Sequence, residues 1–184
     1  MSQRRHDPER RDRIIDSALA TIAEHGVAGT THRKVAKHAD VPLGSMTYHF
    51  ADMDELLREA FTRYAKRIAR RFADRLAAVS GTDQLVAAIA DLVHHDLSES
   101  PEDVVLTLEL YTLAARKPDF RRITHDWMGQ SRAVLERHMD ATAAFEVDAL
   151  IEGLFIHVSL DQQPRSRTGT ERAIRRFLTD VPAR

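Results

Sequence analysis

The stretch VPLGSMTYHF, residues 41–50, gathers several side chains that make directional polar contacts. The hydroxyls of Ser45 and Thr47 are followed at once by Tyr48 and His49. Serine and threonine hydroxyls can meet base edges in a major groove, and tyrosine and histidine are donors to phosphate oxygens. The stretch is therefore a candidate surface for contact with nucleic acid, and Arg33, upstream of it, could reach into the same groove.

Signatures of catalysis are missing from the sequence. It has no Gly-x-Ser-x-Gly elbow, no phosphate loop and no His-Glu-x-x-His motif. His94, His95 and Asp96 suggest a metal site at first sight. Neighbouring residues of a helix point about 100° apart, however, so the two imidazoles cannot face one ion without distortion. We predict no metal, no cofactor and no enzyme activity.

Two short helices separated by a turn must position the polar stretch. Thr30 or Thr31 can supply the N-cap hydroxyl of the first helix, which runs to Ala39. Pro42 pushes the residue before it out of the helical region and so marks the turn, after which a second short helix fits residues 44–50. This arrangement predicts a helix-turn-helix, whose second helix enters the major groove.

Helical periodicity dominates the rest of the chain, without strand alternation. A helix from Arg10 is expected to end at Gly26 in the left-handed conformation, and a long helix starts after Asp52, with Glu55 completing a capping box. The segment 147–160 is apolar almost all round, which predicts burial against the core or another subunit. Further helices are expected around residues 85–93, 101–113, 118–138 and 170–181. The fold is predicted to be all-α, with about nine helices.

The 184 residues carry a formal net charge of -1, but the charge is unevenly spread. Residues 63–75 are strongly basic and residues 82–110 contain no Lys or Arg, so a polyanion would meet one end of the molecule. The absence of cysteine excludes a disulfide framework and fits a reducing, intracellular compartment. The basic N-terminus lacks the apolar segment of a secretory signal, and no apolar run is long enough to span a membrane.

The segment GTTHRKVAKHADVPLGSMTYHFADMDELL, residues 29–57, resembles the DNA-binding region of the TetR (tetracycline repressor) family. The family's usual pattern is a Thr-Thr pair, a helix, a short turn and then Gly-x-hydrophobic-Tyr-x-His-Phe, and the match covers the N-terminal third of the chain. The resemblance implies a helix-turn-helix domain over residues 1–51 and a helical ligand-binding and dimerisation domain over residues 52–184. The DNA contacts that it implies come from Thr31, His32, Arg33, Leu43, Gly44, Ser45, Thr47, Tyr48 and His49.

Three positions depart from the family pattern. Met53 stands where the family usually has a lysine that grips a phosphate. Thr47 stands where a tyrosine is frequent, which leaves Tyr48 as the aromatic phosphate contact. Asp40 replaces the usual turn glycine, a tolerable change because Asp adopts the left-handed conformation more readily than most residues.

The remaining helices must then supply a pocket and a dimer interface. Polar side chains within apolar stripes, with apolar neighbours, are the pocket candidates; they are Phe61, Tyr64, His95, Glu109, Leu110, Tyr111, Leu113, Trp127, Met128 and His157. The last two helices are expected to pair across a two-fold axis in a four-helix bundle, as the resemblance also implies. The interface residues expected there are Leu150, Gly153, Leu154, His157, Ile174, Phe177 and Leu178.

Taken with the resemblance, the sequence predicts a cytoplasmic homodimeric repressor without a membrane anchor. It binds a palindromic operator in double-stranded DNA, and a small-molecule effector releases it. Two alternatives stay open. One is an all-α small-molecule-binding protein that has lost DNA binding, as Met53 hints. The other is a small helical enzyme that uses the His and Asp side chains of residues 94–96.

Overall fold

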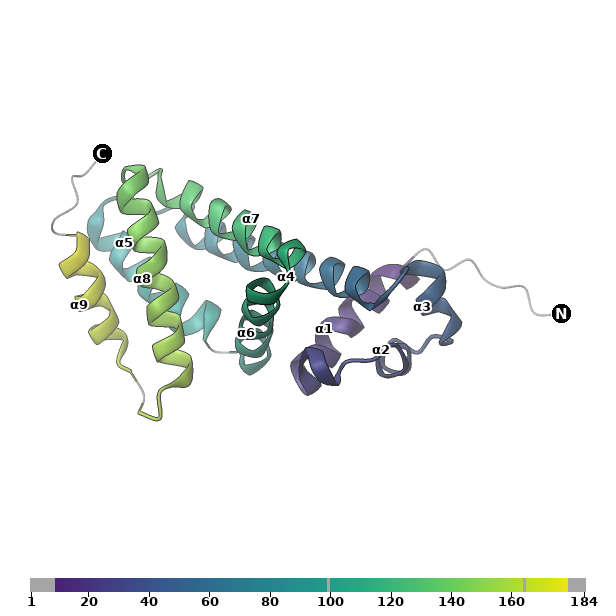
Figure 1. Ribbon diagram of the computed structural model, residues 1–184. Coiled ribbons are helices and arrows are strands. Elements are labelled where there is room, and N and C mark those ends of the chain that lie inside the picture. Colours follow the sequence, from purple (N-terminus) through teal and green to yellow (C-terminus); the bar gives the residue numbers. More distant parts are fainter. Residues whose placement is uncertain (1–8, 99, 164, 179–184) are drawn as a thin grey trace.

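The computed structural model describes residues 9–98, 100–163 and 165–178, and within these ranges the chain is helical without any strand. The predicted all-α class is therefore confirmed. The elements, labelled in Figure 1, are α1 Arg10–Gly29, α2 His32–His38, α3 Gly44–His49, α4 Met53–Leu76, α5 Thr82–Asp91, the π-helix η1 Leu92–Leu97, α6 Pro101–Arg116, α7 Pro118–Leu135, α8 Ala141–Leu160 and α9 Arg167–Leu178.

Several helix starts follow the local chemistry expected from the sequence. Asp52 accepts a hydrogen bond from the backbone N–H of Glu55 at 2.7 Å, which confirms the predicted cap of α4. The Glu55 carboxylate reaches back to the backbone N–H of Ala51 at 2.6 Å, one residue earlier than a standard capping box requires. Pro101 occupies the first turn of α6, where a missing N–H costs nothing.

The first helix does not end where the sequence predicted. Gly26 has a φ of 67° and a ψ of 170°, so it interrupts α1 with an extended conformation available essentially only to glycine. Helical residues then resume and continue to Gly29. A Cβ atom at Gly26 would lie 2.7 Å from Oε1 of Glu109, so the glycine also permits a close approach of α1 to α6.

Two other elements differ in extent from the expectation. The helical pattern around residues 85–93 continues as η1, a π-helix that reaches Leu97. The seventh helix ends at Leu135, three residues before the predicted limit. The last helix begins at Arg167, and the predicted positions 179–181 lie outside the described residues.

The buried apolar side chains divide into two cores. The first core joins α1, α2 and α3 to the N-terminal part of α4 and to α6 and α7, and it includes Met46, Phe50, Phe61 and Trp127. The second core joins α5, η1, α8 and α9 to the C-terminal ends of α4 and α7. The first core therefore contains residues from both sides of the predicted domain boundary after residue 51.

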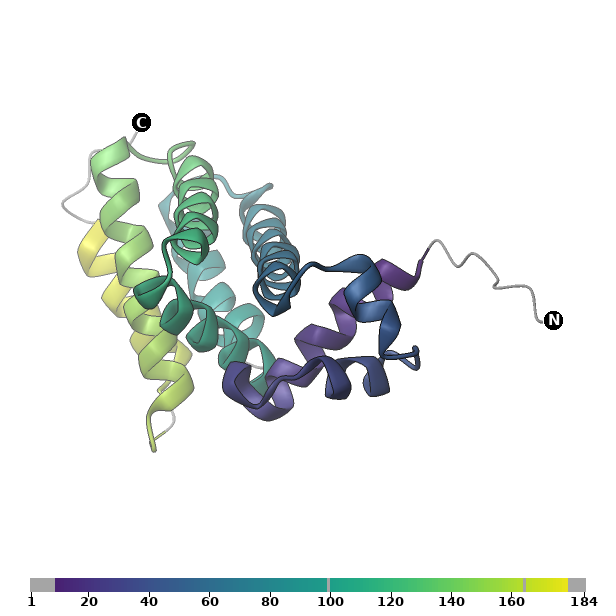
Figure 2. The same ribbon diagram turned by 45° about the vertical axis from the view of Figure 1, so that its right-hand side comes forward.

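The two ends of the molecule are linked by long helices. Figure 1 shows α4 and α7 side by side, with the unit of α1, α2 and α3 at one end and with α8 and α9 at the other. The view in Figure 2 shows α2 and α3 standing away from the helical body, which leaves the outer side of α3 uncovered. No helix of the described chain is long and apolar enough to cross a membrane.

Candidate functional site

A small core fixes the position of α3. Met46 and Phe50 on α3 and its C-cap pack with Val35 and Ala36 of α2, and all four are buried. The turn between the helices is closed by the backbone N–H of residue 41, which donates to the carbonyl of Ala36 at 3.0 Å. Asp40 in this turn has a φ of 51°, so it adopts the left-handed conformation that the sequence predicted for it.

The opposite side of α3 is open to solvent. The exposed fraction is 83% for Tyr48 and 53% for Leu43, both large values for aromatic or aliphatic residues. Gly44 and Thr47 are exposed between them. Arg33 on α2 is exposed as well, so a cationic side chain is available in the same motif.

Three of the predicted DNA-contact residues, Ser45, His32 and His49, are buried or half-buried, and a fourth, Thr31, is engaged in a helix cap. Ser45 is only 9% exposed, because it lies one turn before the half-buried His49 on the inward side of α3; this position corrects the expectation that Ser45 faces outward. His32 is half-buried, and its Nε2 atom has no hydrogen-bond partner among the described residues. Thr31 is exposed, but its side chain is engaged as the N-cap of α2, where it accepts from the N–H of Lys34 at 3.3 Å.

The electrostatic environment of α3 is cationic. Desolvation by burial, and then the charges of Arg10 and Arg11, lower the pKa of His49. The ring of Tyr48 meets that of His49 edge to face, with centroids 4.9 Å apart. Met53, at the usual lysine position, is partly buried against the first core, so this side chain supplies no cation there.

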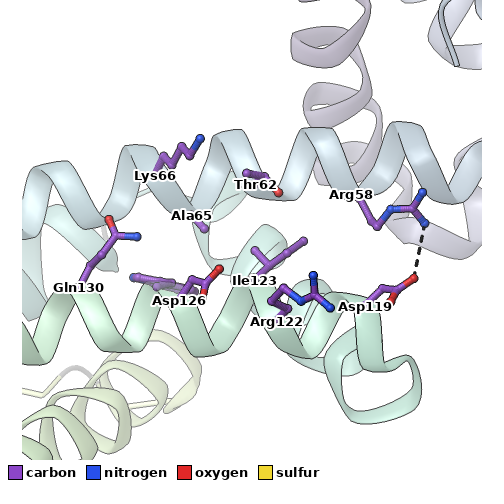
Figure 3. A pocket seen from close by; sticks show the side chains of 10 residues that line it. Arg58, Thr62, Ala65, Lys66, Asp119, Arg122, Ile123, Asp126 and Gln130 are labelled. Carbon is purple, nitrogen blue, oxygen red and sulfur yellow. Dashed lines mark ion pairs between the residues drawn. The ribbon is translucent and has the colours of Figure 1, made fainter.

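A second candidate site is the groove between α4 and α7, which has a volume of about 460 Å³ (Figure 3). The groove carries charges of both signs: Arg58 faces Asp119 across it at 3.9 Å, and Lys66 and Arg122 are exposed. Its lining consists of Arg58, Thr62, Ala65 and Lys66 from α4 and of Asp119, Arg122, Ile123, Asp126, Trp127 and Gln130 from α7. Of the ten pocket residues predicted from the sequence, only Trp127 contributes to this groove.

Behind Trp127, the structure brings three of the predicted pocket residues together in one row of aromatic rings. The ring of Tyr64 meets Trp127 edge to face at a centroid distance of 6.3 Å. Tyr111 stacks on Trp127, with ring centroids 5.9 Å apart and ring planes inclined by 20°. The row ends on α8, where Glu152 accepts a hydrogen bond from the Tyr111 hydroxyl at 2.6 Å.

Two carboxylates of α8 have perturbed proton affinities. Burial raises the pKa of Glu152 to about 7, against the stabilising hydrogen bond from Tyr111. Burial also raises the pKa of Asp148 to about 6, although Arg132 lies 3.4 Å away and opposes the shift. Buried carboxyl groups behave in this way because the charged form loses more hydration than the neutral form.

The other predicted pocket residues are dispersed. Phe61 and Leu110 are fully buried in the first core, and Leu113 is nearly so. Glu109 lies against Gly26 at the contact of α6 with α1, and Met128 is half-buried on α7. His95 is exposed on η1 beside Asp91, and His157 lines a separate groove between α8 and α9.

Glu152 and Asp148 were missed because an apolar helix with scattered acids looks like a simple core helix. The signal that could have found them is their four-residue spacing, which puts both carboxylates on the same side of α8.

Only part of the expected dimer interface is exposed on the surface of the chain. Leu150, Gly153, Leu154 and Phe177 are partly exposed on α8 and α9, and His157 is exposed. Ile174 and Leu178 are instead 0% and 8% exposed, since they fill the second core against α5 and η1; this burial corrects their assignment to the interface. Three large apolar residues of α8 that the sequence analysis did not select are exposed, namely Phe145, Ile156 and Leu160.

The His and Asp residues of η1 are engaged in structural contacts. Nε2 of His94 lies 2.9 Å from the Thr170 hydroxyl, and Asp96 binds Arg75 through two hydrogen bonds of 2.7 Å. Within the described ranges no group of three or more potential ligands is arranged to hold a metal ion.

An exposed helix at the end of a helix-turn-helix, joined to a larger helical body, is the arrangement of a DNA-binding regulator. Comparison with known proteins agrees with this class. The model for bacterial regulatory proteins of the tetR family matches residues 14–60, and the model for the tetracyclin repressor-like C-terminal domain matches residues 80–180. The chain belongs to the TetR family of transcriptional regulators, and it is not an enzyme.

Individual relatives cover nearly the whole chain. The transcriptional regulator SCO7518 of Streptomyces coelicolor A3(2) is 51% identical, with a TM-score of 0.87 over 94% of this chain and 99% of that one. The multidrug binding protein EbrR in complex with ethidium is 33% identical, with a TM-score of 0.79 over 95% and 99% of the two chains. The regulator BetI of Paraburkholderia xenovorans is 30% identical over 84% of each chain.

Proposed function

We propose that this regulator is a homodimeric repressor that binds a palindromic operator through α3 and leaves it when a small molecule binds. The observation that carries the proposal is the exposed face of α3, with Tyr48 and Thr47 held outward by the buried Met46 and Phe50. In a two-fold dimer the two recognition helices would enter successive major grooves, about 34 Å or one DNA turn apart. Such a repressor acts on chromosomal DNA and therefore works in the cytoplasm.

The release step is supported by the packing of α4. This helix starts directly after the helix-turn-helix and runs without interruption along the groove that it shares with α7. A ligand that binds one arrangement of these helices more tightly than another would shift the population toward it, by no more than the difference in its affinity for the two. The multidrug-binding relative EbrR supports an organic effector, because it was solved with ethidium.

Selection of binding sites from random DNA tests the proposal, followed by anisotropy titrations on the selected sequence at several salt concentrations. A palindromic site and a steep salt dependence are expected, since phosphate contacts release counterions. Tyr48→Phe should weaken binding about fivefold, as expected for the loss of one hydrogen bond to phosphate. Arg33→Ala should weaken it about tenfold or more through lost charge-assisted contacts.

Arg70→Ala is the matched control, because Arg70 is an exposed arginine on α4, outside the helix-turn-helix. Its operator affinity should equal that of the unmodified protein. A protein that shows no preference for any sequence in the selection would contradict the repressor function and favour a small-molecule-binding protein without DNA binding.

A further inference from the structure

Base recognition by α3 has to come from a small set of side chains. Its exposed residues are Gly44, Thr47 and Tyr48, and they are preceded by the exposed N-cap residue Leu43. No Arg, Lys, Asn, Gln, Asp or Glu occurs among residues 41–50. Those are the side chains that read guanine, adenine and cytosine by hydrogen bonds in a major groove. The recognition helix therefore lacks the usual hydrogen-bonding partners of three of the four bases.

The polar side chains that α3 does carry are mostly engaged or enclosed. The hydroxyl of Thr47 donates to the carbonyl of Gly44 at 3.3 Å, within the helix itself. Ser45 is buried and His49 is half-buried. Tyr48 is exposed, and a tyrosine hydroxyl is suited to a phosphate oxygen. Hydrogen bonds from α3 thus position the helix on the DNA more than they distinguish bases.

Lysine and arginine side chains of the two short helices lie on α2. Arg33, Lys34 and Lys37 are all exposed there. The first helix of a helix-turn-helix crosses the DNA backbone, which places these charges at phosphates. Contacts to phosphates fix the register of the protein but carry no base identity. Sequence selectivity then depends on apolar contacts of α3 with the bases.

Leu43 is the large apolar side chain that α3 leaves open to such a contact. It is 53% exposed and belongs to neither apolar core, whereas Val41, two residues earlier, packs against the first core. Single exposed leucines are common on protein surfaces, so exposure alone assigns no role. The position of Leu43 is what matters, because the N-terminal residues of a recognition helix contact base edges.

The neighbours of Leu43 allow a close approach. The backbone of Leu43 is helical, with a φ of -53° and a ψ of -36°, so Leu43 and Thr47, four residues apart, lie on the same side of the helix. A Cβ atom at Gly44 would meet no atom within 4 Å, and Gly44 has no positive φ, so the fold itself does not require glycine there. Glycine at this position instead lets another molecule approach the backbone closely.

We propose that Leu43 makes this regulator selective for thymine, by packing on the C5-methyl group of one thymine in each half of the operator. This methyl group is the apolar feature that an unmodified base presents in the major groove, and apolar side chains contact it. The inference rests on the proposed DNA-binding function and adds the base that one side chain selects. Each half-site should therefore contain a thymine at one fixed position, repeated by the two-fold symmetry of the palindrome.

The test removes the methyl group from the DNA and leaves the base pair intact. Each thymine of the selected operator is replaced in turn by deoxyuridine, and the affinity of the full-length protein is measured by anisotropy. At one position in each half-site the dissociation constant should rise about fourfold, as expected for the loss of one buried methyl group. An operator in which no thymine depends on its methyl group would overturn the proposal.

A second substitution in the DNA adds the methyl group instead of removing it. Cytosine and 5-methylcytosine at the position found by this scan differ only in the methyl group. The 5-methylcytosine operator should bind more tightly than the cytosine operator, because the methyl group occupies the same place in the groove as that of thymine. Equal affinity for the two operators would count against a direct contact with the methyl group.

Two variants assign the contact to one side chain. Leu43→Ala should weaken binding to the thymine operator and abolish the difference between thymine and deoxyuridine, because the side chain that meets the methyl group is missing. Tyr48→Phe is the matched control: it should weaken binding to both operators equally and keep the difference, since its hydroxyl contacts a phosphate. A deoxyuridine effect that stays unchanged in Leu43→Ala would assign the effect to DNA shape or to another residue and refute the proposal.

The outcomes separate this inference from the proposed function. Selection from random DNA with Leu43→Ala should lose the preference for thymine at that one position and keep the rest of the half-site. A protein that selects a palindrome without any methyl dependence linked to Leu43 keeps the repressor function and loses the inference. A protein that selects no DNA sequence at all loses both.

Discussion

Neighbouring residues on one short helix meet opposite environments, and this contrast decides what each can do. Tyr48 is almost fully exposed, while Ser45, one turn earlier, is buried with Met46. Only the first can contact a partner without repacking the small core beneath α3. Glu152 on α8 is instead an acidic residue that is partly buried beside the Tyr111 hydroxyl, and burial raises its pKa, which favours the neutral form.

The enclosed carboxyl makes stability depend on pH in a direction opposite to that of a salt-bridged acid. Burial raises the pKa of Glu152 from its ordinary value of 4.5 to about 7 in the folded protein, so the folded state retains its proton between these values. Stability contributed by this group is present below pH 4.5, falls as the pH rises and is lost above pH 7. Glu152→Gln should therefore gain on the order of 1–3 kcal/mol at pH 8 and little at pH 5.

Urea unfolding at the two pH values measures this difference. Asp148, whose pKa of about 6 gives a smaller contribution in the same direction, is present in both proteins. Glu146→Gln serves as the control on the same helix. Equal losses of stability between pH 5 and pH 8 in the Glu152→Gln variant and in the unmodified protein would contradict the argument.

At the scale of the elements, α4 and α6 are joined by a compact polar contact. The two oxygens of Asp103 on α6 accept from Arg67 and Arg71 at 2.7 Å each, and the Tyr64 hydroxyl donates to the Asp103 carbonyl at 2.8 Å. Asp103 is buried, whereas the two guanidinium groups are nearly half exposed. The contact is therefore asymmetric. The buried carboxylate needs the two arginines to compensate its charge, whereas the partly exposed guanidinium groups can be hydrated without it.

Replacing Asp103 and replacing its two arginine partners should lower the free energy of unfolding by different amounts. Asp103→Asn keeps the shape and is expected to cost about 1–2 kcal/mol, because the exposed guanidinium groups regain water. The double variant Arg67→Ala with Arg71→Ala leaves a buried charge and should cost about 3 kcal/mol or more. Urea unfolding at pH 7 measures both, and Arg70→Ala, on the exposed side of α4, should change stability by less than about 0.5 kcal/mol. A double variant no less stable than Arg70→Ala would refute the proposed asymmetry.

The elements also show which parts of the structure the sequence could predict. Asp52, Pro101 and Asp40 were assigned correctly because caps, helix starts and turn conformations depend on a few adjacent residues. Gly26 lies close to Glu109 of α6, 83 positions away in the sequence, and the hydrogen bond of Tyr111 with Glu152 joins residues 41 positions apart. Contacts of that kind arise from packing between helices, which local patterns do not encode.

The surface of the whole molecule explains where a second copy would bind. Helix α8 lies at the end of the molecule opposite the helix-turn-helix (Figure 1), and it carries the exposed apolar residues Phe145, Ile156 and Leu160. An exposed apolar surface of this kind is typical of a subunit interface. A two-fold axis through this end would leave both recognition helices free for DNA.

Disruption of this surface should separate the protomers. Ile156→Glu places a charge on the proposed interface and is expected to give a monomer at micromolar concentration, with weaker operator binding because one subunit then holds one half-site. Gel filtration with light scattering measures the mass. Ala133→Glu, an exposed change on α7, should leave the dimer intact. A monomeric unmodified protein would refute the dimer, and a dimeric Ile156→Glu would exclude this surface as the interface.

The first core connects the recognition helix directly to the groove between α4 and α7. Phe50 beneath the recognition helix and Trp127 beside the groove belong to the same continuous apolar interior, with no flexible tether between them. Close-packed interiors deform little and switch between discrete arrangements. A rearrangement around the indole of Trp127 would therefore reach α3 through changes in side-chain packing. The helix-turn-helix would then move as part of a continuous packed body and would not rotate freely about a flexible linker.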